Sequence, residues 1–277
     1  MKHRRVAVVL SGGGAKAAAH AGAMRALEEW EVKPAHYVGT SMGAVVAAMF
    51  ASGLDYDGVL KRMLLISRND VATPSTSLLL GPFATSLLSG RKLRDAIRGL
   101  VPAERFADLK VPLTVTAVDA HTGQLALFGA MGFERVSLVD ALYASCALPI
   151  YYPPALIEDR EFVDGGLRAV LPLDVASEVD PDLIVASAAG PSFFADPVEP
   201  ALPVPPMITA HNESMRILMA AQTEETLARW RDGPVPLVLV RPRLGSGATF
   251  AVEGVVEYVE KGYRAAQRAL REHLDAE

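Results

Sequence analysis

Residues 6–30 read VAVVLSGGGAKAAAHAGAMRALEEW, and this stretch decides the fold. Its first part, Val6–Leu10, is a continuous apolar run with β-branched residues, which predicts a strand buried on both faces of a parallel sheet. Three glycines then break the run. Residues 15–30 are rich in alanine and carry apolar residues on one face at helical spacing. The chain therefore opens with a strand, a glycine turn and a helix.

The same order repeats at once. Residues 37–39 predict a second short strand, and residues 42–51 predict a second helix that begins directly after Ser41. Two consecutive strand–turn–helix units indicate right-handed crossovers, a mostly parallel central sheet and helices on both of its faces. The expected fold class is therefore α/β. Apolar patterns along the rest of the chain predict strands at 113–119, 124–128, 161–163, 183–188 and 237–240, and helices at 138–146, 207–230 and 255–274.

The composition excludes several classes of protein. The 277 residues are 51% hydrophobic and 21% charged, which excludes disorder as the main state. The net charge of −5 comes without a basic stripe, so we expect no nucleic-acid partner. The single cysteine, Cys146, excludes an internal disulfide and a cysteine-rich metal site. We expect neither a metal ion nor a cofactor.

We expect residues 1–277 to form one domain with two long loops, at about 67–90 and 191–206, because neither stretch shows a regular period. The longest apolar stretch, 42–51, is far shorter than the ~20 residues of a membrane helix. The apolar run near the basic N-terminus is also shorter than the about 7–15 residues of a signal peptide. The sequence therefore predicts a cytoplasmic protein, with peripheral membrane contact left open.

Gly39-Thr40-Ser41-Met42-Gly43 fits the pattern G-x-S-x-G and lies between a predicted strand and a predicted helix. In this context a sharp turn lifts the serine hydroxyl clear of the backbone, where it can act as a nucleophile. Gly39 and Gly43 leave room for the turn, and the helix N-terminus favours developing negative charge. The alternative is a helix cap, in which Thr40 or Ser41 bonds a free backbone N–H. The combination of strand, motif and helix favours a nucleophile at Ser41.

The glycines after the first strand allow three interpretations. A phosphate-binding P-loop needs Gly-Lys followed by Ser or Thr, whereas here alanines flank Lys16. A dinucleotide site fits the local pattern but needs an acidic residue at the end of the second strand, which the sequence lacks. The third interpretation is an oxyanion hole, because consecutive glycines at a helix N-terminus present unobstructed backbone N–H groups. In a parallel sheet the loop lies at the same edge as Ser41, so its members are candidate donors: Gly12, Gly13 and Gly14.

No histidine stands out as a general base. An ordinary triad would use His211, but that residue begins a long predicted helix with no loop signal, which indicates a surface position. His20 lies inside the first helix, where packing or capping is the expected role. Asp164-Gly165-Gly166 follows a strand-like run, and two glycines remove side-chain bulk where another group must approach. A plain Asp-Gly turn is the alternative, and alone this motif favours the turn.

Together these blocks resemble the patatin-like phospholipase family. The resemblance rests on the glycine loop with its helix, on residues 39–43, on 144–154 and on 164–166, and it extends to 260–266. It implies a single patatin-like catalytic domain with three-layer architecture, and a Ser–Asp dyad that works without histidine. In that dyad Ser41 is the expected nucleophile and Asp164 the expected general base. The oxyanion hole and the supporting glycines follow from the same resemblance: Gly12, Gly13, Gly14, Gly39, Gly43, Gly165 and Gly166.

The resemblance also implies the activity of a serine acyl hydrolase that cleaves carboxylic esters of lipids, such as a phospholipid or a lysophospholipid. A serine acyltransferase on the same site, and a catalytically weak protein that binds acyl lipids or a partner, are the alternatives. Apolar residues of the two long loops predict an acyl channel, a flap or a contact with a membrane or micelle surface, with core packing as the alternative: Leu78, Leu79, Leu80, Phe83, Leu87, Leu88, Phe193 and Phe194. The sequence indicates no particular protein partner.

Overall fold

An eight-stranded sheet forms the centre of the computed structural model, which describes residues 5–193, 206–245 and 252–275. The strand order is β5-β6-β3-β2-β1-β7-β8, with β4 also paired to β3. The neighbouring strands β3, β2, β1, β7 and β8 run parallel to one another. Strands β4 and β6 pair antiparallel with β3, and β5 pairs antiparallel with β6. The strands are β1 (Val6–Leu10), β2 (Pro34–Thr40), β3 (Leu113–Asp119), β4 (Leu125–Gly129), β5 (Ala155–Ile157), β6 (Arg160–Asp164), β7 (Leu183–Ser187) and β8 (Leu237–Val240).

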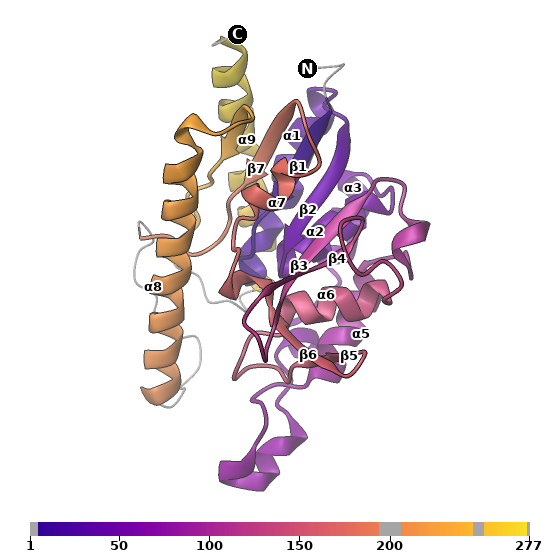
Figure 1. Ribbon diagram of the computed structural model, residues 1–277, viewed down its shortest axis with the longest axis vertical. Helices are drawn as coiled ribbons and strands as arrows, with labels where there is room; N and C mark the ends of the chain where they lie inside the picture. Colours follow the sequence, from indigo (N-terminus) through magenta and orange to yellow (C-terminus); the bar gives the residue numbers. More distant parts are fainter. Residues whose placement is uncertain (1–4, 194–205, 246–251, 276–277) are drawn as a thin grey trace.

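Helices cover the sheet on both faces (Figure 1). The longer ones are α1 (Ala18–Glu29), α2 (Met42–Ala51), α3 (Tyr56–Met63), α5 (Gly90–Leu100), α6 (Leu138–Cys146), α8 (Pro206–Arg229) and α9 (Val255–Asp275). The shorter ones are α4 (Arg68–Val71) and α7 (Leu173–Ser177), and 3₁₀ turns include η1 (Gly14–Ala17), η2 (Thr76–Phe83), η3 (Phe106–Asp108), η4 (Gly165–Leu167), η5 (Trp230–Asp232) and η6 (Val252–Gly254). The predicted α/β class is confirmed.

Strand β1 explains the three layers, because its side chains alternate between two apolar cores. Val6, Val8 and Leu10 belong to one core with residues of α1, α2, α5, α6 and α9. Ala7 and Val9 belong to a second core with α7 and the C-terminal end of α8. Because β1 is buried on both faces, none of its side chains reaches solvent, and its sequence is therefore a continuous apolar run.

Helices α1 and α9 come into backbone contact although they lie at opposite ends of the chain. A Cβ atom at Gly22 of α1 would overlap the carbonyl oxygen of Val259 in α9. A Cβ atom at Gly262 would likewise overlap the carbonyl oxygen of Ala19. The two glycines therefore allow a close helix crossing that no other residue type permits. This crossing fixes the C-terminal helix against the first helix of the chain.

The stretch expected as a long loop at 67–90 contains more structure than its sequence predicts. It holds α4 and the two 3₁₀ turns of η2, which meet at Gly81, where φ is +58°. Leu88 packs against the first core, so the core-packing alternative holds for that residue. Of the other expected loop, residues 194–205 lie outside the described residues, and Phe194 lies among them.

No helix in the described part of the chain combines the length and the apolar character needed to cross a membrane. Helix α8, although long, buries only Ala220, Thr223 and Thr226. It lies along the outside of the molecule, beside the second face of the sheet (Figure 1).

Candidate active site

Ser41 occupies a strained turn between β2 and α2. Its backbone has φ 53° and ψ −134°, a region that L-residues rarely adopt. The side chain makes no capping hydrogen bond to α2, so the helix-cap interpretation is wrong. Its Oγ instead donates to Oδ2 of Asp164 at 2.7 Å. This is the geometry of a strand-to-helix nucleophile elbow, in which the hydroxyl projects away from the helix that follows.

The two glycines of the elbow are required by contact with backbone. A Cβ atom at Gly39 would overlap Ala44 in the first turn of α2. One at Gly43 would overlap the carbonyl oxygens of Leu10 and Ser11 at the end of β1. Helix α2 can therefore start directly against the two strand ends only because both positions lack a side chain.

Asp164 lies at the end of β6 with its two carboxylate oxygens in different roles. Oδ1 accepts from the N–H of Gly166 at 2.7 Å, which fixes the carboxylate plane. Oδ2 faces Ser41. A Cβ atom at Gly165 would overlap Thr116 on β3, so the turn after Asp164 needs glycine there. The Asp-Gly-Gly segment is thus a turn, as the alternative interpretation held, and it also brings the aspartate to the serine.

Burial sets the acidity of this aspartate. The side chain is 5% exposed, and loss of solvation raises the pKa of Asp164 to about 6, against the lowering effect of the hydrogen bonds from Gly166 and Ser41. A carboxylate with this pKa is a stronger base than an aspartate in water, and it is still ionised at neutral pH. The site therefore holds a serine hydroxyl hydrogen-bonded to a base of suitable strength.

A buried histidine holds the first peptide of the glycine loop. Nε2 of His20 lies 2.9 Å from the Ser11 carbonyl oxygen, and Nδ1 lies 2.8 Å from Oγ of Ser187. Because a carbonyl oxygen only accepts, the ring proton is on Nε2, and Nδ1 accepts from Ser187. Burial lowers the pKa of His20 to about 4, so the ring is neutral at pH 7. The same peptide also donates, from the Gly12 N–H to the Val170 carbonyl oxygen at 3.0 Å.

The glycine loop reaches the serine, as the parallel arrangement predicted. A Cβ atom at Gly12 would lie 3.5 Å from Cβ of Ser41. The Gly12 N–H is already bonded to Val170, so its part in an oxyanion hole requires that bond to break. No backbone hydrogen bond among the described residues uses the N–H of Gly13 or Gly14. These two groups are the better candidate donors, and the assignment stays a prediction.

One contact and one candidate donor of the elbow were missed from the sequence. The N–H of Ser41 donates to Oγ of Ser145 at 2.7 Å, which ties the elbow to α6. Ser145 is part of the stretch that carries the family resemblance, but nothing in its local sequence indicates this contact. The N–H of Met42 belongs to the first turn of α2, where backbone donors lack helical partners. The residue after an elbow serine is a general source of oxyanion donors, so Met42 could have been named from the motif alone.

Two buried histidines have partners other than the dyad. Both ring nitrogens of His20 are occupied, and Nε2 of His36 bonds Thr114 at 2.8 Å. His211 lies in α8, as the helix pattern predicted, but it is half-buried rather than exposed. Within the described ranges, no group of three His, Cys, Asp or Glu side chains is placed to hold a metal ion.

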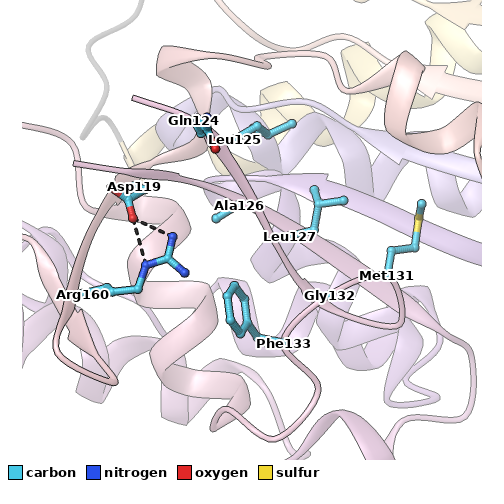
Figure 2. A pocket seen from close by; sticks show the side chains of 9 residues that line it. All are labelled: Asp119, Gln124, Leu125, Ala126, Leu127, Met131, Gly132, Phe133 and Arg160. Atoms are coloured by element: carbon cyan, nitrogen blue, oxygen red, sulfur yellow. Dashed lines mark hydrogen bonds and ion pairs between the residues drawn. The ribbon is translucent and has the colours of Figure 1, made fainter. Parts of the chain in front are cut away.

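A pocket of about 270 Å³ lies at the edge strand β4, and neither Ser41 nor Asp164 lines it (Figure 2). Its charged pair is Arg160 and Asp119, joined by two hydrogen bonds at 2.7 and 3.0 Å. Backbone N–H groups of His121 and Thr122 also bond Asp119, and these contacts lower its pKa to about 2. A carboxylate so fully engaged closes the β3–β4 turn and is a poor candidate for acid–base chemistry.

Comparison with known proteins now decides the family. The sequence profile described as Patatin-like phospholipase matches residues 8–177. The chain belongs to the patatin-like phospholipase family. The matched residues include the glycine loop, the elbow and Asp164. The family resemblance found from the sequence is therefore confirmed.

Among relatives, an uncharacterized NTE family protein of Mycobacterium tuberculosis is 32% identical over 200 residues, 70% of this chain and 52% of that protein. Patatin-like phospholipase domain-containing protein 7 of Rattus norvegicus is 29% identical over 192 residues, 67% of this chain and 14% of that protein. This family member thus spans about half, or less, of the curated relatives it matches. The solved structure of VipD from Legionella pneumophila has a TM-score of 0.52 at 14% identity, covering 99% of this chain and 67% of that one, and shares the fold.

Proposed function

We propose that the protein is a serine acyl hydrolase that cleaves carboxylic esters of lipids, with phospholipids or lysophospholipids as substrates. The observation that carries the proposal is the 2.7 Å hydrogen bond from Ser41 Oγ, in its strained turn, to the buried carboxylate of Asp164. A hydroxyl next to a base at a strand-to-helix elbow is the arrangement that nucleophilic acyl transfer requires. Membership of a family described as phospholipases supports the lipid substrate.

In the first half of the proposed reaction, Ser41 Oγ attacks the ester carbonyl carbon and its proton passes to Oδ2 of Asp164. The carbonyl oxygen becomes an oxyanion, and the backbone N–H groups of Gly13, Gly14 and Met42 are the donors expected to bind it. One such donor is worth about 3–4 kcal/mol of transition-state stabilisation. The C–O bond to the alcohol then breaks, and the alcohol leaves with the proton from Asp164.

In the second half, water attacks the acyl-serine. Asp164 takes a proton from the water, and the oxyanion donors act again. Collapse of the intermediate releases the fatty acid and returns the proton to Ser41 Oγ. The single aspartate thus serves as base, then acid, then base, and a pKa of about 6 suits both directions of transfer near neutral pH. No histidine is needed in this cycle.

A fluorophosphonate probe tests the proposal without a guess about the substrate. The wild-type protein and Ser41→Ala are treated with the probe, and the labelled peptide is identified by mass spectrometry. We expect a single phosphonylated peptide that contains Ser41, and no label on the Ser41→Ala protein. Activity is then measured with a nitrophenyl ester and with phosphatidylcholine. Labelling of the Ser41→Ala protein to the same extent would overturn the assignment.

The same samples distinguish the alternatives. With an alcohol acceptor present, a hydrolase releases fatty acid, whereas an acyltransferase forms a new ester that mass spectrometry detects. A protein that only binds acyl lipids leaves Ser41 unlabelled and produces neither. The proposal stands only if label on Ser41 and release of fatty acid occur together.

A further inference from the structure

Residues 71–90 contain no Asp, Glu, Lys, Arg or His. The chain as a whole is 21% charged, so a stretch of this length would carry about four charged residues at the average composition. Removing a charge from water is costly, and segments that enter an apolar medium avoid it. The stretch is broken by Pro74, Gly81 and Pro82, which excludes a membrane-spanning helix. It therefore forms a local, uncharged projection, which we call the apolar tip (residues 74–88).

The apolar tip gathers three strongly exposed large apolar side chains within five residues of sequence. Leu79 is 90% exposed, Phe83 82% and Leu80 60%. These three residues lie on the two 3₁₀ turns of η2, and the segment projects from the body at the bottom of Figure 1, opposite the chain ends at the top. Exposed apolar side chains gathered on one projection indicate a surface that is covered in use.

The three serines of the apolar tip are bonded to groups within the tip. Oγ of Ser75 and Oγ of Ser77 lie 2.9 Å apart, Ser77 Oγ donates to the Ser86 carbonyl oxygen, and Ser86 Oγ donates to that of Leu88. Backbone bonds close both turns, from Leu78 to Ser75 and from Ala84 to Gly81. In a lipid layer, polar groups must find their partners within the protein. The hydroxyl groups named here already do so.

Where the apolar tip joins the rest of the protein, it carries exposed basic side chains and is hydrogen-bonded to the loop that leads to the active site. Arg91 and Lys92 are exposed in the first turn of α5, directly after the uncharged stretch. The backbone N–H groups of Leu87 and Leu88 donate to the carbonyl oxygens of Ile150 and Tyr151, both at 2.8 Å. That loop starts at Ala147, whose carbonyl oxygen accepts from the N–H of Asp164 at 3.1 Å. Backbone hydrogen bonds of one loop, residues 147–151, therefore connect the tip to Asp164.

We infer that the apolar tip inserts into the surface of a lipid bilayer, with Leu79, Leu80 and Phe83 among the acyl chains and Arg91 and Lys92 at anionic headgroups. Arg91 and Lys92 follow the uncharged stretch directly, at the depth where anionic headgroups would lie. Segments that bind at a membrane surface commonly combine apolar insertion with electrostatic attraction of this kind. The choice of lipid over another apolar partner rests on the proposed function. Insertion brings the site to the layer that holds its substrate.

Vesicle sedimentation tests the inference in the Ser41→Ala background, where no hydrolysis alters the lipid. We compare the parent protein with Leu79→Asp/Phe83→Asp on vesicles of phosphatidylcholine mixed with phosphatidylglycerol. Neither side chain has packing to lose, so the variant folds. We expect its partition to vesicles to fall at least about tenfold. Leu274→Asp, at the C-terminal end of α9, is the control: the side chain is 39% exposed, and the C-terminus lies opposite the apolar tip in Figure 1, so we expect this variant to bind as the parent does.

A second variant isolates the charges. In Arg91→Glu/Lys92→Glu, the acidic residues suit the N-terminus of α5, so the helix is retained. We expect weaker binding to vesicles that contain phosphatidylglycerol and little change on phosphatidylcholine alone. Binding that is equal for all variants would overturn the inference. So would a lipid-free dimer that Leu79→Asp/Phe83→Asp dissociates, because the tip would then be an interface between copies.

Activity distinguishes this inference from the proposed function. In the active protein, the tip variants are expected to hydrolyse a soluble nitrophenyl ester as the wild type does, while hydrolysis of vesicle phospholipid falls. If the wild type binds vesicles through the tip but hydrolyses no ester, the proposed function fails and the docking surface stands. If esters are hydrolysed and the tip is indifferent to lipid, only the docking surface fails.

Discussion

Asp164 lies directly opposite Ala117 in the pairing of β6 with β3. The preceding residue on β3, Thr116, lies opposite Thr40 in the pairing with β2. Thr40, the residue before the nucleophile, and Asp164 thus lie opposite two consecutive residues of β3. This register brings Ser41 and Asp164 within hydrogen-bond distance. A shift of either pairing by one residue would separate them, because a one-residue slip turns each side chain to the other face.

Asp164→Asn should lower kcat for a nitrophenyl ester by about 10²–10⁴-fold. Asparagine keeps the shape of the side chain and can still bond Gly166 and Ser41, but it cannot take the proton from Ser41. The measurement is steady-state kinetics on the purified variant. His211→Ala is the control and should leave kcat unchanged. The reverse outcome, with activity lost in His211→Ala and kept in Asp164→Asn, would identify an ordinary histidine triad.

Activity should depend on pH through the ionisation of Asp164. Burial raises its pKa to about 6, and only the ionised form accepts a proton. We therefore expect kcat/KM to fall about tenfold per pH unit below pH 6 and to level off above it. The check is a profile from acid to mildly alkaline pH, with activity recovered on return to pH 7. A profile that stays flat through pH 6 would contradict Asp164 as the base.

The same carboxylate should cost the protein stability at neutral pH. Its pKa is about 3.8 when unfolded and about 6 when folded, so its stabilising contribution is full below pH 4 and is lost as pH rises through 6. Asp164→Asn has no such loss and should be more stable at pH 8 by about 2–3 kcal/mol. Urea unfolding at pH 4 and pH 8 measures it. The advantage of the variant must shrink at pH 4, and a constant difference would point to another cause.

His20→Phe should lower kcat by about 10–10²-fold while KM changes about twofold or less. Phenylalanine keeps the ring volume but removes the donor to the Ser11 carbonyl oxygen, so the first peptide of the glycine loop is free to rotate. The oxyanion donors that follow are then less well ordered. His20→Gln, whose amide can donate to the same oxygen, should recover part of the rate.

Ser187→Ala provides the matched control for that prediction. It leaves Nδ1 of His20 buried without a partner and should destabilise the fold by about 1–3 kcal/mol. The bond from Nε2 to Ser11 is retained, so kcat should stay within about threefold of the wild type. If both variants lose rate in proportion to their loss of stability, the histidine is merely a packing residue.

The sequence predicted those elements whose burial is visible in the local pattern. The bounds of β1, α2, α6 and β8 agree with the apolar runs from which they were predicted. Helix α3, helix α5 and the three-residue strand β5 were missed. Helix α3 and strand β5 are short, so tertiary packing stabilises them more than any local pattern. Helix α5 does carry an apolar face at helical spacing, with Leu93, Ala96, Ile97 and Leu100 buried, but it begins and ends near glycines and was overlooked. The two turns of η2 were missed because 3₁₀ turns have no apolar period of the helical kind.

For the site, local sequence sufficed for Ser41 but not for its partners. The elbow is defined by five consecutive residues between a strand and a helix. Asp164 is 123 residues away, and the Asp-Gly-Gly turn gained weight only through the family resemblance. The contact of His20 with Ser187 spans 167 residues. Such pairs depend on which strands become neighbours, and a single sequence does not contain that information in its local pattern.

The crossing of α1 and α9 at Gly22 and Gly262 sets a limit on how the protein can be dissected. The family profile ends at residue 177, which invites excision of a minimal catalytic unit there. Such a truncation would remove β7, the neighbour of β1 opposite to β2, and would uncover the face of α1 that meets α9. We expect the shortened polypeptide to aggregate on expression. Fusion and domain-exchange experiments with this protein should therefore carry the C-terminal hundred residues along, as part of the same folding unit.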